Sequence, residues 1–134
     1  MHKPGNADLA ARALDAAGNA WCPYSGLSVG AALLDDKGNV YSGCNVENAS
    51  YPEGSCAETA AIAAMILGGG RHIDTIVVAG MQDDIVPCTP CGGCRQRISE
   101  FASGKTRVLV LTGPDAWDEW AIDDLLPASF KFER

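Results

Sequence analysis

The 134-residue sequence has few basic residues and no long apolar stretch. None of its apolar runs approaches the roughly 20 residues that a helix needs to cross a bilayer, and residues 1–6 lack the apolar segment of a secretory signal. Ten Lys and Arg residues are scattered among 17 Asp and Glu, for a net charge of -7. Proteins that hold nucleic acid usually cluster their basic residues. We therefore expect no nucleic-acid partner, no membrane association and a cytoplasmic location.

Internal repeats, linkers and low-complexity tracts are also missing, so we expect one domain spanning residues 1–134. Helical spacing of apolar residues predicts helices over residues 7–17, 56–67 and 91–102. Apolar and β-branched runs predict strands over residues 27–34, 40–46, 73–79, 106–112 and 117–122. Residues 35–39 form a turn that makes the first two strands a hairpin, and Asp123 or Asp124 is expected to cap a last helical turn. This order predicts a three-layer α/β/α fold around a mixed five-stranded sheet.

Cysteine placement is the strongest chemical signal in the chain. Without a secretory signal, the six cysteines are expected to be thiols rather than disulfides. Cys91 and Cys94 lie three residues apart at the start of one predicted helix, and Cys56 opens another. A catalytic zinc site uses three protein ligands and leaves a fourth position for water. Helix N-termini also favour thiolates, so we predict one zinc ion per chain at Cys56, Cys91 and Cys94.

A second ligand register is possible, because Pro87-Cys88-Thr89-Pro90-Cys91-Gly92-Gly93-Cys94 contains two overlapping Cys-x-x-Cys pairs. We choose the later pair because Pro90 is tolerated at a helix start but would interrupt a helix that began at Cys88. Cys88 could instead be the fourth ligand of a structural zinc ribbon. A redox Cys-x-x-Cys is another alternative, although Gly92-Gly93 does not follow a thioredoxin-like pattern.

Glu58 distinguishes a catalytic metal site from a structural one. It lies two residues after Cys56, in the first turn of the same predicted helix. A carboxylate beside a zinc-bound water can take its proton to form hydroxide and then return the proton to a leaving nitrogen. Hydrolytic deamination of an amidine carbon, such as C4 of cytosine, requires a zinc site of this kind with an adjacent carboxylate. A non-enzymatic zinc module would have no use for Glu58.

Several further segments resemble the small oligomeric cytidine deaminases of pyrimidine salvage, and the resemblance covers nearly the whole chain. Besides the cysteine motifs, the matching segments are Pro23-Tyr24-Ser25, Val29-Gly30-Ala31-Ala32-Leu33, Gly43-Cys44-Asn45-Val46-Glu47-Asn48-Ala49, Tyr51-Pro52 and Leu125-Leu126-Pro127-Ala128-Ser129-Phe130. The resemblance implies deamination of cytidine and 2′-deoxycytidine to uridine and 2′-deoxyuridine, with Glu58 as the proton shuttle. It also implies active sites that are shared between subunits. Because the predicted helix over residues 56–67 is apolar around most of its circumference as well, we expect a homotetramer, with a dimer as the alternative.

The resemblance also implies roles for individual residues. Asn45 and Glu47 match the contacts to the ribose hydroxyls, and their alternate positions on a strand point their side chains the same way. Phe130 matches an aromatic residue that stacks on the base. The other residues assigned to substrate binding are Leu27, Asn48, Ala49, Tyr51 and Ala57.

Two departures from the family pattern bear on the zinc site and on the substrate. Thr59 stands where the family often has an arginine that hydrogen-bonds the zinc thiolates, and Leu27 stands where an aromatic residue is common. The alternatives left open are a deaminase of another small aminopyrimidine, a deaminase of a nucleoside antibiotic and a polynucleotide editor. The pair Asn45 and Glu47 favours a nucleoside, and the acidic net charge opposes a polynucleotide.

Overall fold

A computed structural model describes residues 3–132 of the chain. The sheet has the strand order β2-β1-β3-β5-β6, and a short strand β4 pairs with β3 beside this path. The strands are β1 (Ser28–Asp35), β2 (Val40–Cys44), β3 (Ile73–Gln82), β4 (Asp84–Val86), β5 (Arg107–Gly113) and β6 (Ala116–Ala121). Among these six strands, β3 and β5 pair in parallel and the other pairings are antiparallel. The mixed sheet is confirmed, but its sixth strand, β4, was missed by the sequence prediction.

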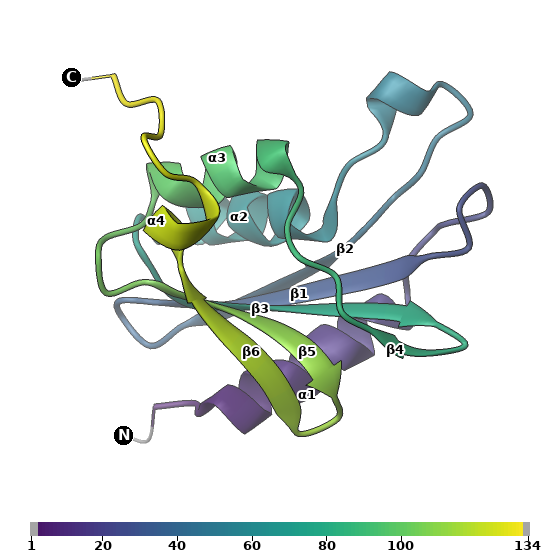
Figure 1. Ribbon diagram of the computed structural model, residues 1–134, viewed down its shortest axis with the longest axis horizontal. Helices are drawn as coiled ribbons and strands as arrows, with labels where there is room; N and C mark the ends of the chain where they lie inside the picture. The colour runs from purple at the N-terminus through teal and green to yellow at the C-terminus, as the bar shows by residue number, and fades with distance from the viewer. Residues whose placement is uncertain (1–2, 133–134) are drawn as a thin grey trace.

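Helices cover both faces of this sheet (Figure 1). Helix α1 (Asn6–Ala17) packs on one face, and α2 (Ala57–Leu67), α3 (Gly92–Glu100) and the short α4 (Ile122–Leu125) pack on the other. Strand β1 supplies both cores because its side chains alternate: Leu33 joins the α2 side and Leu34 joins the α1 side. The three-layer α/β/α prediction is therefore confirmed.

Glycines let two helices approach the sheet closely. A side chain at Gly30 would place its Cβ 1.9 Å from the carbonyl oxygen of Ala13 in α1, and one at Gly43 would place its Cβ 2.6 Å from the backbone nitrogen of Ala61 in α2. Neither position has room for a methyl group. The contact at Gly43 fixes the first half of α2 against β2.

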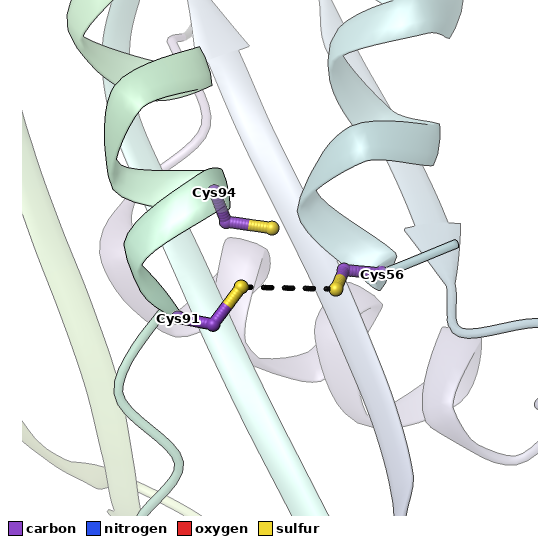
Figure 2. A group of neighbouring side chains, drawn as sticks. All are labelled: Cys56, Cys91 and Cys94. Atoms are coloured by element: carbon purple, nitrogen blue, oxygen red, sulfur yellow. Dashed lines mark hydrogen bonds between the residues drawn. The ribbon is translucent and has the colours of Figure 1, made fainter. Parts of the chain in front are cut away.

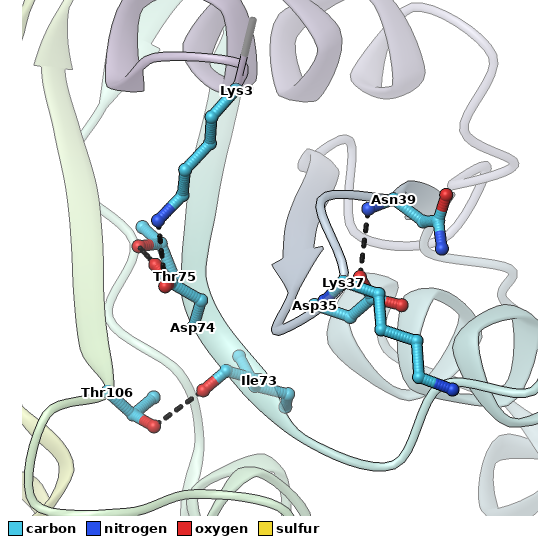
Figure 3. Close-up of polar contacts among 8 residues, drawn as sticks. All are labelled: Lys3, Asp35, Lys37, Asn39, Ile73, Asp74, Thr75 and Thr106. Carbon is cyan, nitrogen blue, oxygen red and sulfur yellow. Dashed lines mark hydrogen bonds and ion pairs between the residues drawn. The ribbon is translucent and has the colours of Figure 1, made fainter. Parts of the chain in front are cut away.

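Polar contacts fix the turns at the end of the sheet opposite the cysteines (Figure 3). The buried Asp35 accepts hydrogen bonds from the backbone N–H groups of Lys37 and Asn39 at 3.0 and 2.8 Å, which shapes the β1–β2 turn. The Thr106 hydroxyl donates to the carbonyl of Ile73 at 2.6 Å and so links β5 to the start of β3. The turn predicted over residues 35–39 is confirmed.

The last helix differs from its prediction. It begins at Ile122 directly after β6, with Ala121 in the cap position and no side-chain cap. Asp123 and Asp124 lie inside its first turn, so the predicted aspartate cap is wrong. Within residues 3–132, no helix is both long and apolar enough to cross a membrane.

Candidate metal centre and active site

Three thiols meet where α2 and α3 begin (Figure 2). Cys56 is the N-cap of α2, Cys91 is the N-cap of α3, and Cys94 lies in the first turn of α3. Each helix follows a loop from the same end of the sheet, so both N-termini open at one place. The sequence motifs placed these cysteines on two separate helices, and the fold brings them together.

The sulfur geometry fits a zinc ion. All three sulfurs lie within 4.8 Å of one another, and the Sγ atoms of Cys56 and Cys91 are 3.9 Å apart. A Zn–S bond of about 2.3 Å in a tetrahedral site places sulfurs about 3.8 Å apart. Three thiols within reach of one ion and with this spacing form a ligand set suited to zinc. Cys88 is not in the cluster, although it lines the adjacent cavity.

The thiol pKa values differ because their surroundings differ. The pKa of Cys91 is lowered, chiefly because a backbone N–H at Cys94 donates to its sulfur. The pKa values of Cys56 and Cys94 are raised, mainly by burial. The Thr59 hydroxyl lies 3.7 Å from the Cys94 sulfur and favours its thiolate form. Among the three thiols of the cluster, Cys91 therefore loses its proton most readily.

Glu58 lies in the first turn of α2 and is only 3% exposed. Burial raises its pKa above the usual range for a carboxyl. Its side chain lines the same cavity as Cys56 and Cys91, so a reacting atom held beside the metal would lie within this cavity too. A carboxyl with a raised pKa is better suited to accepting and returning a proton than an ordinary carboxylate.

The cavity beside the thiols has a volume of about 320 Å³. Five of the predicted substrate-binding residues line it: Leu27, Asn45, Glu47, Tyr51 and Ala57. Asn48 lines a neighbouring hollow of about 360 Å³, which shares Glu47 and Tyr51 with the first. The exposed Ala49 is not among the residues that line either one.

Phe130 lies away from the cavity of its own chain. Its side chain is 70% exposed, and its carbonyl accepts a hydrogen bond from Gln96 of α3 at 3.2 Å. It lines a separate hollow with Ser99 and Glu100. A single chain therefore does not bring Phe130 to the thiol cluster.

Some residues of the cavity wall had no role in the sequence prediction. Val29 and Thr89 line the cavity, but neither residue type gives a signal that could have marked it as part of the site; Cys88, the alternative ligand, lines the same cavity. Asn45 also has a structural role, because its amide accepts from the Val29 N–H at 2.8 Å and donates to the Leu27 carbonyl at 2.9 Å. It thus holds the backbone that forms one wall of the cavity.

A thiol triad and a buried carboxylate, set at the N-termini of two helices of an α/β/α domain, define a zinc-dependent hydrolase. Comparison with known proteins agrees with this class. Residues 5–112 match the family model described as the cytidine and deoxycytidylate deaminase zinc-binding region. The chain belongs to this deaminase family.

Relatives match the chain over most of its length. A cytidine deaminase of Sporosarcina psychrophila is 38% identical over 125 residues, which are 93% of this chain and 90% of the relative. One from Mycobacterium tuberculosis is 39% identical over 123 residues, 91% of this chain and 86% of the relative. The crystal structure of cytidine deaminase from Burkholderia pseudomallei has a TM-score of 0.85 at 36% identity and covers 95% of this chain and 100% of its own.

Proposed function

We propose that this protein hydrolyses cytidine and 2′-deoxycytidine to uridine and 2′-deoxyuridine with release of ammonia. The observation that carries the proposal is the position of Glu58, a buried carboxyl that lines one cavity with the thiol cluster. The relatives described above are named cytidine deaminases, and they match this chain over most of its length.

Different residues of the chain have different roles in the proposed reaction. Cys56, Cys91 and Cys94 would hold zinc, which supplies Lewis-acid activation of the attacking water. Glu58 takes a proton from that water and returns it to the nitrogen that leaves C4 of the base. Burial raises the pKa of Glu58 above its usual range, which makes the carboxylate a stronger proton acceptor than an exposed glutamate.

The wall of the cavity favours an uncharged nucleoside over a nucleotide. Glu47 and Glu58 are its two carboxylates, and no Lys or Arg is among the residues that line this cavity or the hollow beside it. A 5′-phosphate would therefore meet acidic groups and find no cation to pair with it. Asn45 and Glu47 provide the amide and the carboxylate that a sugar diol requires.

An absorbance assay on a panel of cytosine compounds tests this function. We expect turnover of cytidine and 2′-deoxycytidine, much weaker turnover of cytidine 5′-monophosphate, and loss of activity when zinc is removed by a chelator and recovery when it is restored. Preference for the free base cytosine or for the monophosphate would contradict the proposal.

We further propose a homotetramer with shared active sites, in the cytoplasm. Helix α2 has more apolar surface than the sheet covers, since Leu67 is 91% exposed and Ala63 is exposed. Phe130 is exposed as well, and a neighbouring chain's cavity would give its ring a place against the base. All six cysteines are unpaired, in keeping with a reducing compartment.

Co-expression of two inactive or weakened variants tests the shared site. If Phe130 acts in a neighbouring chain, oligomers that mix Glu58→Gln and Phe130→Ala chains contain some sites with both residues intact, and activity exceeds the sum of the parents. The pair Glu58→Gln and Glu47→Gln is the matched control, because both side chains line one chain's cavity. A fully active monomer in light scattering would refute sharing.

A further inference from the structure

Both carboxylate oxygens of Glu47 accept hydrogen bonds from groups of the same chain. Its Oε1 atom accepts hydrogen bonds from the backbone N–H groups of Tyr24 and Ser25 at 3.0 and 3.1 Å. Its Oε2 atom accepts the hydroxyl of Ser25 at 2.5 Å. These donors lie in the segment that precedes β1, whereas Glu47 follows β2, so the contact joins chain segments 22 residues apart.

The Ser25 hydroxyl has a fixed orientation. Its oxygen accepts a hydrogen bond from the backbone N–H of Leu27 at 3.0 Å. With that lone pair engaged, the hydroxyl proton points to Glu47. The backbone of Glu47 is fixed too, because its N–H donates to the carbonyl of Trp21 at 2.8 Å.

Counting acceptor sites shows what remains for a ligand. An ionised carboxylate has about four lone-pair sites on its two oxygens. Two backbone donors take the sites on Oε1, and Ser25 takes one on Oε2, which leaves one site on Oε2. These same donors, the Ser25 hydroxyl first, lower the pKa of Glu47, so the group stays ionised and can only accept a hydrogen bond.

The backbone donors alone would leave the second oxygen poorly defined. Both act on Oε1, so the carboxylate could still turn about that anchored atom. The Ser25 hydroxyl is the contact that fixes Oε2.

We infer that Ser25 is a positioning residue that orients Oε2 of Glu47, so that its one remaining acceptor site takes one hydroxyl of the substrate's sugar. The inference rests on the proposed nucleoside substrate. It implies that Ser25 acts on substrate binding through Glu47 and has no part in the proton transfers of Glu58.

Steady-state kinetics of Ser25→Ala test the inference. We expect KM for cytidine to rise about 10- to 150-fold, the effect of losing one hydrogen bond to a charged group, with kcat within about twofold of the unmodified protein. Ser25→Thr keeps the hydroxyl and should restore most of the loss. Ser42→Ala is the matched control, since Ser42 is an exposed serine of β2 outside both hollows.

Two further measurements separate positioning from a general structural effect. In a Glu47→Gln background, Ser25→Ala should change KM less than about twofold, because the two residues act through one contact. The unmodified protein should discriminate between cytidine and its 2′-deoxy or 3′-deoxy analogue, and Ser25→Ala should reduce that discrimination. Additive KM effects, or discrimination that is unchanged in Ser25→Ala, would overturn the inference.

A measurement that does not depend on enzyme activity tests the role of Ser25 separately from the proposed function. If Ser25 holds Glu47, the Glu47 pKa measured by carbon NMR should rise in Ser25→Ala and stay unchanged in Ser42→Ala. A rise in a protein that turns over no nucleoside would leave the contact standing and the proposed function wrong. An unchanged pKa would overturn the positioning role. If Ser25→Ala does not fold, Ser25→Cys, which keeps a weaker donor, should give a smaller rise in the same measurement.

Discussion

Replacing Glu58 with glutamine removes the proton shuttle and leaves the shape of the site almost unchanged. The side chain is 3% exposed and packs in the first turn of α2, two residues after a metal ligand. A carboxamide of the same size fits this space but can neither take nor return a proton. We therefore expect Glu58→Gln to bind one zinc ion per chain and to lose turnover.

The size of the loss follows from the number of proton transfers that Glu58 performs. General acid–base catalysis contributes about 10²- to 10⁴-fold. If Glu58 performed only one of the two transfers, kcat would fall near the lower end, about 10²-fold. Since the same carboxyl is placed to take the proton from water and return it to the leaving nitrogen, we expect a loss of about 10⁴-fold or more.

Stability should change in the opposite direction from activity. Burial raises the pKa of Glu58, so in the metal-free protein its carboxyl favours the folded state most below the unfolded pKa. That contribution is lost as pH rises through the folded pKa, and glutamine has no such loss. The Tm of metal-free Glu58→Gln relative to that of the unmodified protein should therefore increase as pH rises from the unfolded pKa through the folded pKa of Glu58, and then level off.

Absorbance at saturating cytidine measures kcat, and metal analysis measures zinc. Glu53→Gln, at an exposed glutamate of the 3-10 helix η1 (Tyr51–Glu53), is the control and should keep both. A Glu58→Gln protein that contains zinc and turns over cytidine at the unmodified rate would refute the proposed role of this carboxyl.

Three other predictions concern the metal ligands and the packing of α2. Metal analysis should find stoichiometric zinc in Cys88→Ser and little in Cys94→Ser, because only the latter sulfur belongs to the cluster; the reverse pattern would show that the earlier Cys-x-x-Cys pair binds the metal. Thr59→Val should raise the zinc dissociation constant about 2- to 10-fold in a chelator competition, the effect of one hydrogen bond to sulfur, and an unchanged constant would mean that this hydroxyl does not support the thiolate. Gly43→Ala should lower the free energy of unfolding in urea by about 1–3 kcal/mol, because its Cβ would lie 2.6 Å from backbone of α2. Gly104→Ala, with open space around it, should cost less, and equal costs would contradict the packing argument.

Most helices and strands of the fold could be predicted from patterns within short stretches of the sequence. Runs of apolar and β-branched residues marked β3 and β5, because a strand buried on both faces shows its character in a few consecutive residues. Strand β4 was missed because it is only three residues long and follows a turn at Asp83, whose φ of 65° no run of apolar residues signals. The cap of α4 was wrong because the helix starts without a loop after β6, which no local motif indicates.

The metal ligands were predictable for a related reason. Cys91 and Cys94 form a short motif, and Cys56 with Glu58 forms another, so each half of the site is local. The support of Glu47 by Ser25 was not predictable, because it depends on two loops that the β1–β2 pairing brings side by side. Such long-range contacts have no signature in the sequence of either loop.

Because the zinc ligands come from two different helices, the supply of zinc should affect the amount of this protein in a cell. Cys56 and Cys91 lie 35 residues apart in the chain and cap two different helices, so one bound ion joins both helices to the same point. Binding that requires both helices in place stabilises the native chain by mass action, and the stabilisation grows with the free zinc concentration. Zinc scarcity would then reduce the amount of the protein, through unfolding and degradation of metal-free chains, in addition to silencing those that stay folded.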